Sequence, residues 1–100
     1  MDTEAKIVQA IRSSRQIIID YKYHGSRVVC PHVLFESSKN VLLLDAYQLS
    51  GYSEHQNELP GWDRFTVSEI NSITIMDKTF SEAPKYNPNS NKYYRIIEKL

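Results

Sequence analysis

The chain has 100 residues, 41% of them apolar and 24% charged, a composition typical of one folded domain rather than of a disordered chain. Lysine plus arginine and aspartate plus glutamate each number 12. The resulting zero net charge argues against a dedicated nucleic-acid-binding protein, although it allows a local basic patch.

The cysteine count and the apolar runs bear on where the protein works. Cys30 is the single cysteine, and the longest apolar run, VLLL at 41–44, is far shorter than the roughly 20 residues of a membrane span. With no leader peptide in the sequence, we expect a soluble, cytoplasmic protein with no membrane contact.

The first predicted element is a helix over residues 2–14. Asp2 or Thr3 can cap its N-terminus, and Ile7 and Ile11 lie on one apolar stripe. We expect this helix to flank a β-sheet, because the pattern changes to an alternating one directly after it.

Five stretches with the pattern of β-strands follow the helix. They cover residues 16–23, 27–35, 41–49, 62–67 and 72–76, with one helical turn at 68–71. Five short antiparallel strands in a flat sheet would leave exposed edges, so we expect them to close into a small barrel. Pro31 has no N–H to donate and is expected at a bulge or an edge of this barrel.

Two regions are predicted to lie outside the strands. Residues 50–61 form a long loop with two glycines and a proline, which makes them a candidate lid or docking loop. The last nine residues, KYYRIIEKL, have helical spacing and predict a short C-terminal helix packed on the barrel. The expected organisation is therefore a barrel domain with its helix at 1–80 and a tail at 81–100.

The order of motifs resembles the WYL domain family over roughly residues 7–80. The helix IVQAIRSSR precedes IIIDYK, RVVCP, LLLDAY and RFTVSEI. The resemblance implies an Sm-like barrel, and together with the sequence pattern it gives the expected fold: mainly β, with five antiparallel strands, an N-terminal helix and a short C-terminal helix. It also implies a ligand-sensing module, used in regulation of transcription or defence, that recognises nucleic acids or nucleotides through a cluster of arginines.

The chain departs from the family at three places. The Trp-Tyr-Leu triplet that names the family corresponds to Leu42, Leu43 and Leu44 here. Asp63 stands where the family usually has an arginine, and Glu69 stands where it often has another. These changes place the inherited anion site in question, so a second reading stays open.

Five side chains make up the predicted ligand site. Arg27 is expected at the barrel opening, facing solvent, and together with Arg64 it would neutralise a phosphate or carboxylate. Tyr21 and Tyr47 would stack on a base, and His32 would add a pH-dependent donor. The predicted ligand is a small nucleotide-like anion or a short single-stranded nucleic acid.

Other readings of these residues remain. Arg27 could pair with Asp63 or Glu69 in a structural or protein-interaction domain, with a homodimer as one form of it, and the neutral net charge favours that alternative. Cys30 and His32 lie two residues apart, but no orienting acid or oxyanion loop accompanies them. We therefore predict no enzyme, no catalytic residue, no cofactor and no metal site.

Overall fold

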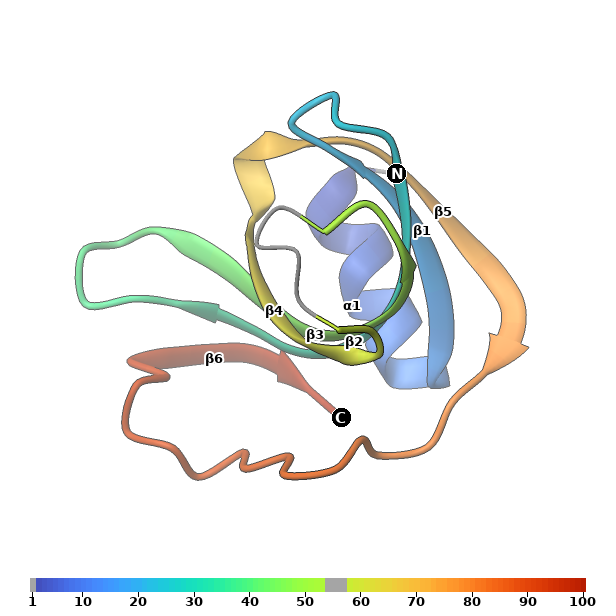
Figure 1. The fold of residues 1–100 in the computed structure, drawn as a ribbon. Helices are drawn as coiled ribbons and strands as arrows, with labels where there is room; N and C mark the ends of the chain where they lie inside the picture. The colour runs from blue at the N-terminus through green and yellow to red at the C-terminus, as the bar shows by residue number, and fades with distance from the viewer. Residues whose placement is uncertain (1, 54–57) are drawn as a thin grey trace.

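The computed structural model describes residues 2–53 and 58–100, which form one α-helix and a six-stranded antiparallel sheet (Figure 1). The elements in chain order are α1 (Thr3–Ser13), β1 (Arg15–Tyr21), β2 (Ser26–Glu36), β3 (Leu42–Gly51), β4 (Gly61–Thr66), the 3-10 turn η1 (Val67–Glu69), β5 (Ile70–Thr79) and β6 (Arg95–Lys99). The predicted mainly β class with an N-terminal helix is confirmed, with six strands rather than five. No helix in the described part of the chain is long and apolar enough to cross a membrane.

Helix α1 begins and ends as its sequence predicts. The Asp2 carboxylate accepts a hydrogen bond of 2.7 Å from the Ala5 N–H, and such a cap is typically worth about 1 kcal/mol. Ser14 ends the helix in a left-handed conformation. The stripe that contains Ile7 and Ile11 is buried, and α1 contacts β1, β2, β5 and β6.

The sheet is curled but open. Its strand order is β4-β3-β2-β1-β5, so the two end strands of this path are consecutive in the chain and are joined by η1 (Figure 1). No ladder between β4 and β5 is found among the described residues, and the predicted closure of the barrel is therefore not found. A hydrogen bond links the two ends of the sheet near η1: the Tyr21 hydroxyl at the end of β1 accepts from the Thr66 N–H of β4 at 2.8 Å. The Lys22 N–H, just after β1, donates to the Glu69 carbonyl of η1 at 3.0 Å.

Strand β2 has different partners along its length, and Pro31 lies where they change. Its first part, through Val29, pairs with β1, whereas its last part, from Val33, pairs with β6. The register with β3 shifts between Pro31 and Val33. The prediction of a bulge at Pro31 is confirmed, and the missing N–H lies where β2 changes neighbours.

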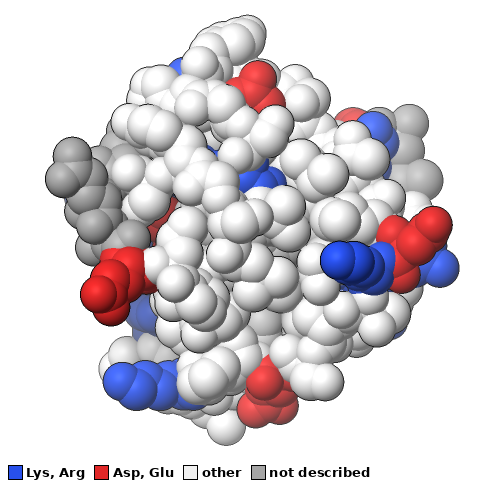
Figure 2. All heavy atoms as spheres, turned by 45° about the vertical axis from the view of Figure 1, so that its right-hand side comes forward, with Lys and Arg blue, Asp and Glu red and all other residues white. Residues whose placement is uncertain are grey.

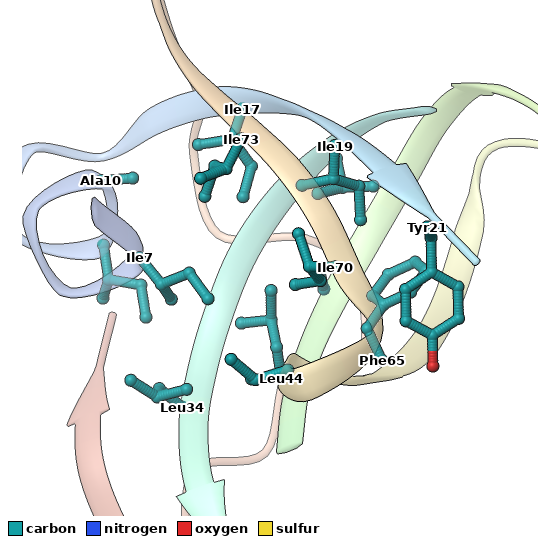
Figure 3. Packing of buried hydrophobic residues seen from close by; sticks show 14 residues of the cluster. Ile7, Ala10, Ile17, Ile19, Tyr21, Leu34, Leu44, Phe65, Ile70 and Ile73 are labelled. Carbon is teal, nitrogen blue, oxygen red and sulfur yellow. The ribbon is translucent and has the colours of Figure 1, made fainter. Parts of the chain in front are cut away.

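The core fills the inner face of the curled sheet, under α1. Figure 3 shows aliphatic side chains from the helix, β1, β2, β3 and β5 meeting around Ile70 and Leu44. At one end of this core Tyr21 packs edge-on against Phe65, with ring centres 5.0 Å apart. This aromatic pair fixes the end of β1 against β4, where the two ends of the sheet approach each other.

The predicted C-terminal helix is wrong, because residues Arg95–Lys99 form strand β6. Once β1 leaves β2, the last part of β2 has an open edge, and β6 satisfies its backbone groups with the pairs Val33↔Lys99 and Glu36↔Arg95. A ladder of this kind outweighs the weak helical preference of nine residues, since isolated helices of that length are marginal. Strand β6 belongs to the same sheet as β1 to β5. The predicted division into a barrel domain at 1–80 and a tail at 81–100 stays a prediction.

The loop predicted at 50–61 is shorter at its start, because β3 continues to Gly51. Residues 54–57 lie outside the described residues. The prediction that residues 50–61 form a lid or docking loop falls on them in part and stays a prediction.

Candidate functional site

The five predicted site residues fall into two groups on opposite faces of the sheet. Arg27 and Tyr21 lie on the inner face, beside the core. Arg64, Tyr47 and His32 lie on the outer face, since strand side chains alternate and the inner face of β4 carries Phe65. The structure therefore does not bring the two arginines into one site.

Arg27 is buried at one end of the curled sheet, and its side chain is 1% exposed. The guanidinium carbon lies 5.1 Å from the ring centre of Tyr21, 5.2 Å from that of Tyr52 and 5.4 Å from that of Phe65. Its Nη1 lies 3.7 Å from a carboxylate oxygen of Asp63. We call these five residues the Arg27 cluster. The expectation that Arg27 faces solvent is wrong, because aromatic rings surround its charged group.

The Arg27 guanidinium keeps unused hydrogen-bond donors. Its Nε and Nη2 are buried and have no hydrogen-bond partner among the described residues. At 3.7 Å the contact with Asp63 is an ion pair longer than a normal hydrogen bond. A buried donor without a partner costs about 1–3 kcal/mol, and more when the group is charged. Such a group calls for an explanation beyond the packing of the fold.

The backbone around Arg27 is held closely. Gly51, at the end of β3, has a φ of 102°, and a Cβ atom there would lie 2.3 Å from the Ser26 carbonyl oxygen and 2.7 Å from the Arg27 Cα. Only glycine allows this approach of β3 to β2. The Gln48 side chain donates a hydrogen bond of 2.8 Å to the Tyr52 carbonyl, which holds the chain that carries the Tyr52 ring beside Arg27.

Arg64 is clamped on the outer face by Asp45, its cross-strand partner. Its Nε and Nη2 donate to the two carboxylate oxygens at 2.7 and 3.1 Å. Asp45 also accepts from the Tyr93 hydroxyl at 2.7 Å and lies 3.5 Å from the Lys92 ammonium. The hydrogen bond to Asp45 raises the pKa of Arg64, and burial raises the pKa of Tyr93. The guanidinium is therefore fixed in place and still 40% exposed.

His32 is fully buried, and both of its ring nitrogens are used by the backbone. With Nδ1 protonated, the ring donates to the Cys30 carbonyl at 2.7 Å, and Nε2 accepts from the Ala83 N–H at 3.0 Å. Burial lowers the pKa of His32, which keeps the ring neutral, and burial raises the pKa of the Cys30 thiol to about 11. In this arrangement His32 holds the segment around Ala83 against β2.

The two tyrosines of the predicted site are also engaged. The Tyr21 hydroxyl accepts from Thr66, and it lies 3.3 Å from a carboxylate oxygen of Glu69, to which it donates. The Tyr47 ring packs edge-on against Trp62 on the outer face, with ring centres 5.6 Å apart. Of the two, only Tyr21 lies beside Arg27.

The sequence reasoning missed the residues that complete each group. Tyr52 lies in the stretch predicted as a loop, so its packing on Arg27 had no signal in the pattern. Asp45 could have been found, because the strand pattern pairs it across from Arg64. Tyr93 and Lys92 come from the tail and reach Asp45 through a contact that no local pattern reveals.

No family model, curated protein or solved structure matches the chain. Among residues 2–53 and 58–100, no group of three or more histidine, cysteine, aspartate or glutamate side chains is placed to hold a metal ion.

Proposed function

We propose that the protein is a non-catalytic binding module for a small anionic ligand or a short single-stranded nucleic acid, with Arg27 as the residue that binds the anion. The observation that carries the proposal is the buried guanidinium with two nitrogens that no described residue satisfies. An oxyanion such as a phosphate or carboxylate accepts two parallel hydrogen bonds from a guanidinium and would supply those partners.

The surroundings of Arg27 fit such a ligand. Three aromatic rings exclude water from the guanidinium, which strengthens its interaction with an anion. Tyr21 and Phe65 are buried, so of the three rings the exposed Tyr52 is the one that could stack on a base. The Tyr52 ring lies 5.2 Å from the guanidinium carbon and is 44% exposed, and we expect it to move aside for the ligand. Asp63 would then be displaced as the weaker partner of the guanidinium.

The charge of the surface favours a small ligand over a long nucleic acid. The face shown in Figure 2 is mostly uncharged, and its acidic and basic side chains stand in separate small groups of both signs. With a net charge of zero, this arrangement offers no long basic track for a phosphate backbone on that face.

The Sm-like barrel and the WYL-like regulatory role belong to the same proposal. Two features support an Sm-like arrangement in which β4 and β5 are left unpaired with each other. They are the sequence order of helix, strands and η1, and the joining of β4 to β5 by η1. The free, buried Cys30 fits a reducing cytoplasmic setting. Regulation of transcription or defence rests on the resemblance alone.

A titration with a matched control tests the proposal. Binding of short single-stranded oligonucleotides and of inorganic phosphate is measured at two salt concentrations for the wild type, Arg27→Gln and Arg95→Gln. Arg95 is an exposed arginine on β6 that pairs with Glu36, so both variants lose one positive charge. The proposal predicts salt-sensitive binding that falls at least about tenfold in Arg27→Gln and less than about twofold in Arg95→Gln. Equal losses in both variants, or no binding by the wild type, would contradict it.

A second candidate function is protein interaction through strand β6. Among the described residues β6 pairs only with β2, which leaves its other edge open. Tyr94, just before the strand, is 70% exposed, and Ile96 on it is also exposed. Open strand edges pair readily with other chains. Sedimentation of the wild type and Ile96→Lys tests it: concentration-dependent association that the substitution removes would favour this candidate, and a monomer in both would reject pairing between copies.

A further inference from the structure

A groove of about 500 Å³ lies on the outer face of the sheet and shares Asp63 with the Arg27 cluster. Strands β3 and β4 form one wall, and the segment 85–93 forms the other. We call this cavity the outer groove. Its lining combines charged, polar and aromatic side chains: Asp45, Trp62, Asp63, Arg64, Lys85, Asn87, Ser90, Lys92 and Tyr93.

Three of the four carboxylate oxygens in the groove already accept hydrogen bonds, whereas donors remain. Asp45 accepts two N–H groups from Arg64 and one O–H from Tyr93, and Lys92 lies beside it. The Asp63 carboxylate accepts from the Arg64 backbone N–H at 2.8 Å and approaches Arg27 with its other oxygen. Arg64 still has N–H groups beyond the two that Asp45 accepts, and its side chain is partly exposed. The groove therefore favours a ligand that accepts hydrogen bonds.

The charges of the groove point to an anion. Three cationic side chains, Arg64, Lys85 and Lys92, face two carboxylates in the lining. With three cations against two carboxylates, the net charge of the groove lining is positive. A single oxyanion group would neutralise it, and the clamped Arg64 would meet that group without losing further side-chain freedom.

Two aromatic side chains add a preference for a flat ligand. The Trp62 indole donates to the Pro84 carbonyl at 2.7 Å and is stacked on Tyr86 on one side. Tyr93 packs on Phe35 with ring centres 4.6 Å apart. Both rings line the groove and are fixed by these contacts, so they form rigid apolar walls next to the cationic groups.

We propose that the outer groove binds a small molecule that carries one oxyanion group, phosphate or carboxylate, attached to a planar ring. The oxyanion lies between Arg64 and Lys92, and the ring lies against Trp62 or Tyr93. The site includes residues of the C-terminal segment and does not depend on the role of Arg27.

The experiment follows the fluorescence of Trp62, which is the only tryptophan in the chain. Phenyl phosphate, benzoate and inorganic phosphate are titrated to millimolar concentration. Comparing the affinities of phenyl phosphate and benzoate shows whether the groove prefers a phosphate or a carboxylate. Comparing phenyl phosphate with inorganic phosphate shows how much the ring adds to the affinity. We expect one of the two aromatic anions to bind at least about tenfold more tightly than inorganic phosphate, which is about 1.4 kcal/mol.

Three variants assign the binding. Lys92→Gln removes a cation, Arg64→Lys keeps the charge but loses the two-point clamp, and both are expected to weaken binding at least about fivefold. Arg95→Gln is the control and is expected to bind as the wild type does. Thermal melts show whether each variant folds, and amide shifts at Asn87 and Ser90 report the groove directly in the wild type. No fluorescence or amide change with any of the three anions, or equal affinity in Lys92→Gln, would overturn the inference. Unchanged oligonucleotide binding by Arg27→Gln would contradict the proposed function and leave this inference standing.

Discussion

Replacing Arg27 with methionine is expected to stabilise the protein while removing anion binding. Methionine has a similar length, fills the same space among the rings of the Arg27 cluster and carries no donors. The guanidinium is 1% exposed and has two nitrogens without a partner in the described residues, so the fold bears a desolvation cost that methionine lacks.

The size of this effect follows from opposing terms. Two buried nitrogens without partners cost about 2–6 kcal/mol together. The contacts of the guanidinium with three aromatic faces offset about 0.5–1 kcal/mol of this desolvation cost each. The ion pair with Asp63 offsets part of the cost that remains. Asp63 is 24% exposed and can be solvated once it loses its partner. We expect a net stabilisation of about 1–2 kcal/mol, in the range measured when buried charges are replaced by apolar residues.

The assay is urea unfolding at neutral pH, with the midpoint and slope compared between the wild type and Arg27→Met. For a domain of this size, about 1 kcal/mol corresponds to a rise of about 4–8 °C in the melting temperature. A destabilisation of more than about 1 kcal/mol would refute the reasoning. It would mean that the guanidinium is part of the structural framework of the fold rather than a group kept for a ligand.

Three further predictions follow. Gly51→Ala is expected to destabilise the protein by at least about 2 kcal/mol, measured by urea unfolding, because the added Cβ meets backbone at 2.3 Å and the φ of 102° suits glycine; a loss below about 0.5 kcal/mol would contradict this. Tyr21→Phe removes the acceptor of the Thr66 N–H and is expected to cost about 1–3 kcal/mol in the same assay, whereas unchanged stability would show that this bond does not hold the end of the sheet. Burial lowers the pKa of His32, so the unfolded chain binds a proton more readily than the folded one. The contribution of His32 to the free energy of unfolding is therefore present above about pH 6.5 and is lost as pH falls through the folded pKa. The slope of this loss is up to about 1.4 kcal/mol per pH unit. His32→Gln should flatten that part of the pH profile, since glutamine can still accept from Ala83 but does not titrate, and the same slope in both proteins would exclude His32 as its origin.

Much of the fold could be predicted, because its signals are local. The cap at Asp2 and the apolar stripe of α1 are set within the helix itself, and the alternation of β1 is visible in the single strand. Pro31 could be placed at a bulge because its missing N–H excludes it from a regular ladder. Strand β6 could not, since its conformation is decided by the open edge of β2, more than 50 residues away in the sequence.

The candidate site was harder to predict for the same reason. Alternation places Arg64 and Phe65 on opposite faces, but it does not say which face carries Arg27 once the sheet curls. The burial of Arg27 depends on Tyr52, which comes from a stretch without periodicity. The role of His32 depends on Ala83, which reaches it only after the tail has packed. Long-range contacts of this kind decide which polar side chains are buried.

The most direct test of the central claim observes the Arg27 guanidinium itself. The Nε–H resonance of Arg27, assigned by comparison with Arg27→Gln, is followed by nitrogen–proton NMR while inorganic phosphate or a short single-stranded oligonucleotide is added. If Arg27 binds the anion, this resonance moves downfield and its exchange with water slows as the ligand saturates. If the resonance stays in place while the oligonucleotide binds, Arg27 does not hold the ligand and the proposed function is contradicted.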